Sequence, residues 1–328
     1  MTAILATLAL SIALCGLYER FARKRQILDI PNERSSHSRP TPHGGGAALL
    51  TAFVLGLLLA TWLYGGWTEP LMTLTICASL LALFGIIDDV RGLSVRWRLL
   101  AYAVVCLVAA TVLLHRVETG SVLWHGVLLL VAAFILLWCL NLYNFMDGID
   151  GIAALQAIFV CSGAAFLSWL AGNDDSYTRY CLLFAAAHCG FLVWNRPPAR
   201  LFMGDTGSVP TGFLLAALAL AGGVQGQLDP LCWLVLSAVF ITDASWTLAR
   251  RVVTGQKFTQ PHRSHAYQRL SRHWNSHLKV DMVVVAINLM WLLPLALAVQ
   301  LWPDYKLFLV LLAYLPLLGG MVKTARLA

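Results

Sequence analysis

Apolar runs of membrane length alternate with short polar segments along the whole chain. A helix rises about 1.5 Å per residue, so about 20 residues cross the ~30 Å hydrocarbon core of a bilayer. Eleven runs predict membrane-spanning helices: 2–18, 44–64, 70–87, 99–114, 121–140, 152–171, 178–194, 208–226, 231–249, 280–302 and 306–322. The pattern therefore predicts an all-α polytopic membrane protein with about 11 transmembrane helices.

The polar segments between these runs differ in charge. Those predicted on one side of the membrane carry 20 of the 23 Lys and Arg residues. They are, approximately, 19–43, 88–98, 141–151, 195–207, 250–279 and the C-terminal tail. Cytoplasmic loops are enriched in Lys and Arg, so this asymmetry predicts that these loops face the cytoplasm and that the N-terminus is periplasmic.

Composition supports this interpretation. The 328 residues are 59% hydrophobic and 12% charged, and the mean hydropathy is +0.74. No polar interruption is long enough for a separate soluble domain, so residues 1–328 are expected to form a single transmembrane catalytic domain. The net charge of +7 is explained by topology and anion binding, and we expect no nucleic-acid partner. The eight cysteines all fall in predicted spans and are interpreted as small buried residues.

The stretch 141–151 is the most informative part of the chain. Polar side chains recur there at every third residue: Asn141, Asn144, Asp147 and Asp150. On a continuous helix such a series drifts by about 60° per step, and Gly148 and Gly151 are placed to break the helix. We therefore expect a helix that ends within this stretch and carboxylates that face a polar pocket. An ordinary polar loop is the alternative. Ionisable groups at a membrane edge are costly and indicate function.

Two further carboxylate groups lie at the cytoplasmic ends of predicted spans. Asp88 and Asp89 are adjacent, and adjacent carboxylates are tolerated where a cation or a substrate proton neutralises them. Their side chains diverge by about 100° on a helix, so one can act while the other orients. Asp205 follows Gly204 at the start of a span and suits a metal ion, beside backbone N–H groups that can meet phosphate oxygens. A helix N-cap is the alternative interpretation of Asp205.

Basic side chains occur in the same loops. Arg34 and Arg39 could hold an anionic head group or serve only to set topology, and the glycines at 44–46 allow close backbone approach. Arg91, Arg96 and Arg98 follow Asp88 and Asp89.

The last long loop adds Arg263 and His265, which suit phosphate binding better than a zinc site with His262, because no cysteine accompanies them. Asp243, in the ninth predicted span, is expected to pair with Arg250 or Arg251.

These groups together indicate a phosphoryl-transfer site at the membrane surface. Carboxylates hold Mg²⁺, the metal binds a pyrophosphate, and Arg and His bind the remaining oxygens. One substrate is then expected to be a lipid phosphate and the other a soluble nucleotide diphosphate compound. A transporter or flippase is the alternative. It predicts internal repeats and charges at the membrane midplane, whereas these charges cluster at the cytoplasmic ends.

Several motifs resemble those of one enzyme family. They are Asp88-Asp89, the Asn-x-x-Asn-x-x-Asp-Gly-x-Asp-Gly pattern at 141–151, Asn195 before Phe-Met-Gly-Asp-Thr-Gly-Ser at 202–208, and the late His-containing loop. In this order, over about residues 30–270, they resemble the polyprenyl-phosphate N-acetylhexosamine-1-phosphate transferases of glycosyltransferase family 4. The superfamily includes phospho-MurNAc-pentapeptide translocases and undecaprenyl-phosphate GlcNAc-1-phosphate transferases.

The resemblance implies roles for individual residues. Asp205 ligates Mg²⁺, with Asn144 as second ligand, and Mn²⁺ is an alternative metal. Asp88 deprotonates or orients the lipid phosphate, with Asp89 beside it, and Asp147 lies close to the metal and the reacting phosphates. The expected substrate-binding residues are Asn141, Asp150, Asn195, Arg263, His265, Arg39 and Arg98.

The chain also departs from the family pattern. Translocases carry three consecutive histidines in the last loop, whereas this chain has His265-Ala266-Tyr267-Gln268. The chain is therefore most similar to O-antigen-initiating members. They transfer a sugar phosphate from a UDP-N-acetylhexosamine to undecaprenyl phosphate, and a UDP-MurNAc-pentapeptide transferase is the alternative. The family also implies a multi-pass protein of the bacterial inner membrane, surrounded by lipid, with a homodimer as one assembly.

Overall fold

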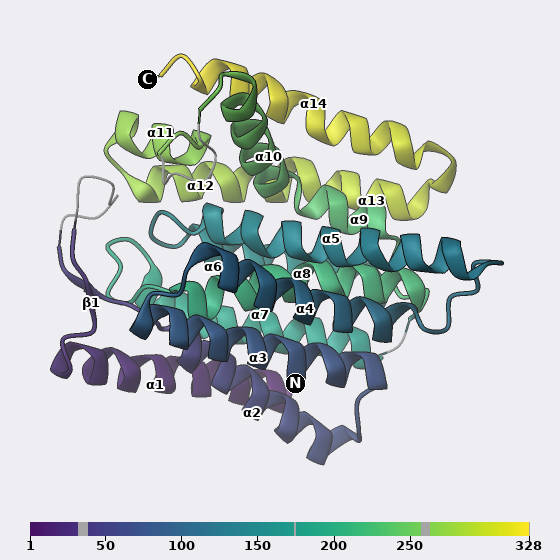
Figure 1. The fold of residues 1–328 in the computed structure, drawn as a ribbon, viewed down its shortest axis with the longest axis horizontal. Helices are drawn as coiled ribbons and strands as arrows, with labels where there is room; N and C mark the ends of the chain where they lie inside the picture. Colours follow the sequence, from purple (N-terminus) through teal and green to yellow (C-terminus); the bar gives the residue numbers. More distant parts are fainter. Residues whose placement is uncertain (32–38, 174, 257–262, 328) are drawn as a thin grey trace.

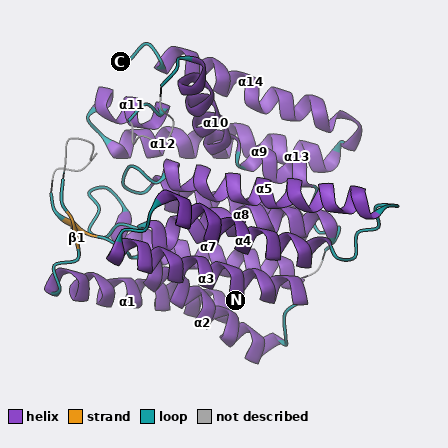
Figure 2. Ribbon diagram, viewed as in Figure 1, coloured by secondary structure: helices purple, strands orange, loops and turns teal. Residues whose placement is uncertain are grey.

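Helices make up most of the chain, and one short strand pair is the exception (Figure 2). The computed structural model describes residues 1–31, 39–173, 175–256 and 263–327. The first helices and strands are α1 (Thr2–Lys24), β1 (Leu28–Asp29), β2 (Thr41–Pro42), α2 (Gly46–Tyr64), α3 (Glu69–Arg91), α4 (Val95–Leu114), α5 (Val122–Met146), α6 (Ile152–Leu170), α7 (Asp175–Asn195) and α8 (Asp205–Val224). The others are α9 (Pro230–Leu236), α10 (Ala238–Val253), α11 (Ala266–Trp274), α12 (His277–Ile287), the π-helix η1 (Asn288–Leu292), α13 (Leu293–Leu301), η2 (Pro303–Tyr305) and α14 (Lys306–Thr324).

The all-α membrane fold is confirmed, but the spans are less uniform than predicted. Within the described residues, nine helices are long and apolar enough to cross a membrane, and the bent pair α9–α10 would be a tenth. The predicted span 178–194 forms α7, in which Arg179, His188 and Asn195 lower the hydropathy. Helix α7 packs against α1, α2 and α6, and His188 and Asn195 are buried, whereas Arg179 is only partly buried.

The long helices lie side by side in a bundle (Figure 1). Helix α8 packs against α3 and α5, and α7 packs against α1 and α6. The C-terminal helices α9 to α14 gather along α5, on one side of this bundle. We call α3 to α8 the core and α9 to α14 the C-terminal arm.

Loops predicted to be cytoplasmic meet at one end of the bundle (Figure 1, left). The turns after α3, α5 and α7 and the β1–β2 pair all lie there. Leu28 pairs with Pro42 and Asp29 with Thr41, in antiparallel register. The carbonyl of Pro42 also accepts a hydrogen bond from Phe202 N at 2.8 Å, so β2 joins the segment that leads into α8.

The C-terminal arm contains two interruptions that face each other. Helices α9 and α10 meet at Ser237 with a bend of 73°, and η1 interrupts the span formed by α12 and α13. Gln156 of α6 connects them, because its Nε2 donates to Leu236 O at 3.1 Å and its Oε1 accepts from Asn288 Nδ2 at 2.9 Å. The buried Gln156 amide thus hydrogen-bonds both to the bend and to the π-helix. Its own donor and acceptor groups are both paired, as expected for a buried polar side chain.

Candidate active site

The predicted carboxylates converge where α3 and α5 end and α8 begins. Asp88 and Asp89 lie in the last turn of α3, Asp147 caps the end of α5, and Asp205 is the first residue of α8. Helix α5 ends at Met146, and α6 starts after Gly151, whose φ is +86°. The predicted break within 141–151 is therefore confirmed.

Arg98 joins two of these carboxylates. Its Nη1 lies 2.6 Å from Asp88 Oδ2 and 3.1 Å from Asp205 Oδ2. Asp88 also accepts a hydrogen bond from Leu93 N at 2.7 Å, which closes the turn between α3 and α4. We expected Arg98 to bind substrate. That role stays a prediction, and in this structure the guanidinium offsets the repulsion between Asp88 and Asp205.

Asp89 points away from Asp88, as the helical geometry predicts. Its Oδ2 accepts a hydrogen bond from Thr206 Oγ1 at 2.8 Å, which ties α3 to the first turn of α8. A Cβ at Gly85 would lie 2.6 Å from Thr206 Cα, so only glycine allows α3 to approach α8 so closely. Close packing therefore fixes the first turn of α8, which carries Asp205.

The glycines before α2 meet the same segment. Gly45 N donates to Phe202 O and Gly46 N to Met203 O, both at 2.9 Å. The expected close backbone approach is confirmed, and its target is the strand-like chain leading into Asp205. Gly204 occupies the N-cap position of α8 with φ of +70°, so Asp205 itself is not the cap.

Asn144 lies beside Asp205. Its Oδ1 accepts from Ser208 Oγ at 2.6 Å, and its side chain hydrogen-bonds to the Asp205 carboxylate. In this orientation the amide nitrogen faces Asp205. Rotating the amide by half a turn would direct its oxygen there, and the Ser208 hydroxyl could then accept instead of donate.

Asp147 is partly buried at the end of α5. Burial raises the pKa of its carboxyl to about 7, and the nearby carboxylates of Asp205 and Asp150 add to this shift. The protonated form is favoured because a low-dielectric site disfavours charge and because like charges repel. Asp147 therefore changes charge near neutral pH.

Asp150 and Asn195 hold loops together. Asp150 Oδ2 accepts from Ala199 N at 2.9 Å and lies 3.2 Å from His277 Nδ1. Asn195 accepts from Gly151 N and donates to Leu201 O, both at 3.0 Å. Both residues thus use these polar atoms to join the turn after α5 to the turn after α7. The predicted Asn141 side chain donates to Leu137 O at 2.7 Å, within α5.

A polar cavity of about 380 Å³ adjoins these turns. Asp150, His277, Arg263 and Arg272 line it. Burial and the neighbouring guanidinium of Arg263 lower the pKa of Arg272, which indicates two cations close together. The cavity therefore combines two predicted substrate-binding residues, Asp150 and Arg263, in a setting that favours an anion.

Two predicted residues lie apart from this cluster. Arg39 is exposed near the start of β2. His265 is buried, with Nδ1 3.2 Å from Asp243 Oδ1. Arg34 and His262 lie outside the described residues.

Asp243 differs from its prediction. It was expected to pair with Arg250 or Arg251, but it accepts hydrogen bonds from Ala266 N at 2.9 Å, Tyr267 N at 3.0 Å and Thr247 Oγ1 at 3.1 Å. The N–H groups at the start of α11 lack partners within the helix and carry the positive end of its dipole, so they attract the Asp243 carboxylate.

The oxygen donors near Asp205 fit a magnesium ion. In the described part of the chain, no three His, Cys, Asp or Glu side chains gather into a complete metal cage. Mg²⁺ does not need one, because it keeps several waters and is commonly held by one or two carboxylates together with substrate phosphates. Asp205 and a rotated Asn144 amide would supply such hard oxygen ligands.

Some residues of this site were not predicted. Thr206 and Ser208 lie within the recognised segment 202–208, but only the packed structure shows that they bind Asp89 and Asn144. No role was predicted for His277, which contacts Asp150. Tyr267 was visible only as a departure from the expected histidine run.

Comparisons with known proteins agree with this geometry. The model of the family "Glycosyl transferase family 4" matches residues 71–223, which include every carboxylate of the cluster. A relative from Bacillus subtilis (strain 168), "Probable undecaprenyl-phosphate N-acetylglucosaminyl 1-phosphate transferase", is 28% identical over 88% of this chain and 82% of its own length. The "Decaprenyl-phosphate N-acetylglucosaminephosphotransferase" of Mycobacterium tuberculosis (strain CDC 1551 / Oshkosh) is 28% identical over 82% of this chain and 75% of its own length.

A third relative represents another branch. The "Phospho-N-acetylmuramoyl-pentapeptide-transferase" of Wolbachia sp. subsp. Drosophila simulans (strain wRi) is 32% identical over 58% of this chain and 62% of its own length. The family match over residues 71–223, these relatives and the polytopic helical fold support the resemblance to the superfamily of polyprenyl-phosphate N-acetylhexosamine-1-phosphate transferases.

Proposed function

We propose that this protein transfers an N-acetylhexosamine-1-phosphate from a UDP-sugar to undecaprenyl phosphate and releases UMP. The observation that carries the proposal is the convergence of Asp88, Asp147 and Asp205 with Arg98 at one end of a membrane bundle. At such a place a lipid phosphate can meet a water-soluble nucleotide. The acceptors and sugars named for the Bacillus and Mycobacterium relatives support this choice.

The reaction we infer is one in-line displacement. An oxygen of undecaprenyl phosphate forms a bond to the phosphorus next to the sugar, and the bond from that phosphorus to the bridging oxygen of UMP breaks. Asp88 and Asp89 orient or deprotonate the attacking phosphate. Bound Mg²⁺, held by Asp205 and Asn144, would neutralise the charge that develops on the phosphate oxygens.

The donor would occupy the adjoining polar surface. Arg263 and Arg272 offer charge-assisted hydrogen bonds to its phosphates, and Asp150, with Asn195, keeps the neighbouring turns in place. Arg98 would stay paired with Asp88 and Asp205 until the metal ion and the substrates bind to these carboxylates. Asp147, at the C-terminal end of α5, would lie next to the reacting phosphates.

A double displacement is the rival mechanism, with an aspartate as nucleophile and a phosphoryl-enzyme intermediate. Steady-state kinetics with both substrates separate the two. Intersecting double-reciprocal lines support direct attack, and parallel lines would contradict it.

The cellular role we infer is the first membrane step of O-antigen or related surface-polysaccharide synthesis, in the bacterial inner membrane. A UDP-MurNAc-pentapeptide donor is the alternative, and the similarity to the Wolbachia relative favours it. The sequence 265–268 argues against it, because only one histidine stands where translocases carry three.

One assay tests the proposal. Purified protein receives undecaprenyl phosphate, Mg²⁺ and, in separate reactions, UDP-GlcNAc, UDP-GalNAc, a UDP-6-deoxy-N-acetylhexosamine or UDP-MurNAc-pentapeptide, and UMP release is measured. Release with one UDP-N-acetylhexosamine supports the proposal, and release with the pentapeptide donor alone supports the alternative branch. Folded protein that releases no UMP would contradict the proposed reaction and favour transport.

A further inference from the structure

We propose that Tyr267 is a positioning residue that holds Asp147 in place through the backbone of Phe145 and Gly148. The inference rests on the proposed function, because Asp147 is assigned there to the reacting groups. It adds a link between the C-terminal arm and the core, and Tyr267 lies outside the residues 71–223 that match the family model.

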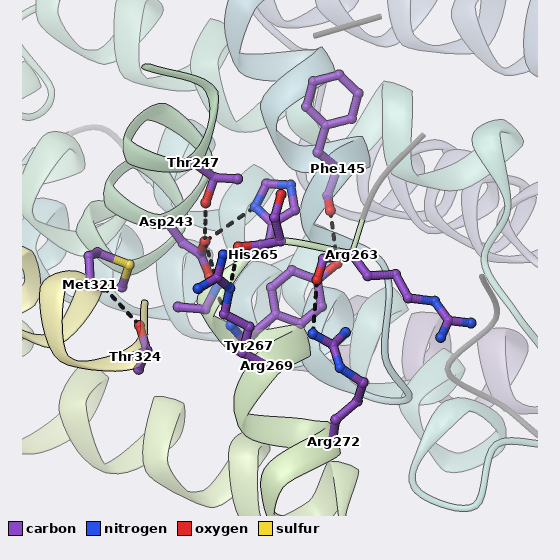
Figure 3. Close-up of polar contacts among 12 residues, drawn as sticks. Phe145, Asp243, Thr247, Arg263, His265, Tyr267, Arg269, Arg272, Met321 and Thr324 are labelled. Atoms are coloured by element: carbon purple, nitrogen blue, oxygen red, sulfur yellow. Dashed lines mark hydrogen bonds and ion pairs between the residues drawn. The ribbon is translucent and has the colours of Figure 1, made fainter. Parts of the chain in front are cut away.

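The tyrosine hydroxyl reaches the end of α5 (Figure 3). Tyr267 Oη donates a hydrogen bond to Phe145 O at 2.9 Å. Phe145 is in the last turn of α5, where carbonyls lack partners inside the helix, and Asp147 follows two residues later as the C-cap. The hydroxyl therefore fixes the main chain at the point where α5 ends and the turn that carries Asp147 begins.

Gly148 gives the hydroxyl its space. A Cβ at this position would overlap the Tyr267 hydroxyl oxygen and would lie 3.1 Å from both Tyr267 Cζ and Gln268 Nε2. Gly148 is not among the residues with positive φ, so its backbone would otherwise accept an alanine. The contact with Tyr267 is thus the main reason for glycine at this position.

The other end of Tyr267 is anchored as well. Its backbone N donates to Asp243 Oδ2, and the preceding Ala266 N donates to Asp243 Oδ1 (Figure 3). Asp243 comes from α10, so it caps α11 from a separate helix. The Tyr267 ring is buried and stacks on His265, with ring centroids 5.6 Å apart. With its backbone and ring both held, the hydroxyl has one available position.

These contacts give a structural role to Tyr267, which stands in the segment 265–268 where members of the family carry several histidines. Two hydrogen bonds connect Asp243 of the arm to Phe145 of the core through one residue, since the Tyr267 backbone N donates to Asp243 and the Tyr267 hydroxyl donates to Phe145 O. Tyrosine both spans the distance between α11 and α5 and presents a donor to a carbonyl. The position would therefore govern turnover by placing Asp147, without contact to the reacting atoms.

The first test removes only the hydroxyl. Tyr267→Phe is expected to lower kcat about fivefold, the effect of losing one hydrogen bond, and to leave KM for both substrates within twofold. Tyr314→Phe is the matched control, because Tyr314 Oη also donates to a backbone carbonyl, that of Leu234, at 2.9 Å within the arm. Equal losses in the two variants would overturn the proposal, because they would reflect a general loss of stability.

The second test uses compensation. Gly148→Ala is expected to lower kcat at least twentyfold, because the new methyl group displaces the tyrosine hydroxyl. In the Tyr267→Phe background, which has no hydroxyl, the same alanine is expected to cost less than threefold. A loss that is equal in both backgrounds would overturn the proposed contact.

A third measurement is independent of the reaction. Hydrogen–deuterium exchange is followed in peptides that cover 141–151, in the wild-type protein, Tyr267→Phe and Tyr314→Phe. Faster exchange in Tyr267→Phe alone supports the positioning role, even if the wild-type protein releases no UMP and the proposed function fails. Unchanged exchange in Tyr267→Phe would overturn the positioning role, even if UMP release confirms the transferase.

Discussion

The core and the C-terminal arm use polar groups in different ways. In the core, charged side chains meet each other at helix ends, as Arg98 does with Asp88 and Asp205. In the arm, Asp243 and Tyr267 bind the main chain, at the start of α11 and at Phe145, as Asp150 also does in the core at Ala199. The comparison indicates that the core presents groups for chemistry and that the arm fixes the backbone that holds them.

Replacing Asp205 should produce the largest effect. Asp205→Ala removes the carboxylate that we assign to Mg²⁺ and is expected to lower kcat on the order of 10³-fold or more, without loss of folded protein. UMP release and a thermal melt measure the two quantities. An active Asp205→Ala variant would remove the metal assignment and the main distinction between core and arm.

Arg98 allows a sharper test of charge in the core. Arg98→Gln removes the cation between Asp88 and Asp205, so the site becomes more negative. We expect kcat to fall about tenfold and the Mg²⁺ concentration for half-maximal activity to fall as well, because attraction for the cation rises. The control is Arg96→Gln, an exposed arginine on the same helix. A higher Mg²⁺ requirement in Arg98→Gln would show that Arg98 does not compete with the metal.

Asp147 predicts a pH dependence. Its pKa is raised to about 7, so the carboxylate form is lost as pH falls through 7. If the charged form is required, kcat should decline as pH falls and approach about tenfold per unit well below 7. Rates measured from pH 5.5 to 8.5 test this, and Asp147→Asn should show a low rate with no such decline. A wild-type profile that is flat across this range would contradict the assignment.

The smallest effect is expected in the arm. Asp243→Asn weakens the cap on α11 and should lower the free energy of unfolding by about 1 kcal/mol, with a severalfold loss of kcat. Asp229 offers a matched comparison, because it caps α9 by accepting from Leu231 N at 2.9 Å. Asp229→Asn should cost similar stability and leave kcat unchanged. Equal kcat losses would mean that the arm acts only through stability.

Local patterns predicted more of this molecule than long-range ones. The end of α5 within 141–151 followed from polar spacing and glycines, which act within a few residues. The different partners of Asp88 and Asp89 agree with the divergence of their side chains on a helix. The bundle of helices, α7 included, followed from run length, whereas the bend that divides the run 231–249 into α9 and α10 did not.

Contacts between residues far apart in the chain could not be predicted from the sequence. Arg98 and Asp205 are separated by 107 residues, and only the packing of α4 beside α8 makes them partners. Asp243 was assigned to the nearby Arg250 or Arg251, whereas it caps a helix that begins 23 residues later. In both cases proximity in the chain was a poor guide, because the folded backbone offered a better-placed partner.

The bend at Ser237 has a consequence for biogenesis. Helices α9 and α10 have 7 and 16 residues, so at about 1.5 Å per residue they rise about 10 and 24 Å, each less than the ~30 Å hydrocarbon core. Both pack against α14, and α9 also packs against α13. The two pieces therefore depend on helices that the ribosome makes later. Full membrane integration of this part must await synthesis of the last helix, so a chain stopped before Lys306 should leave α9 and α10 exposed to quality-control proteases.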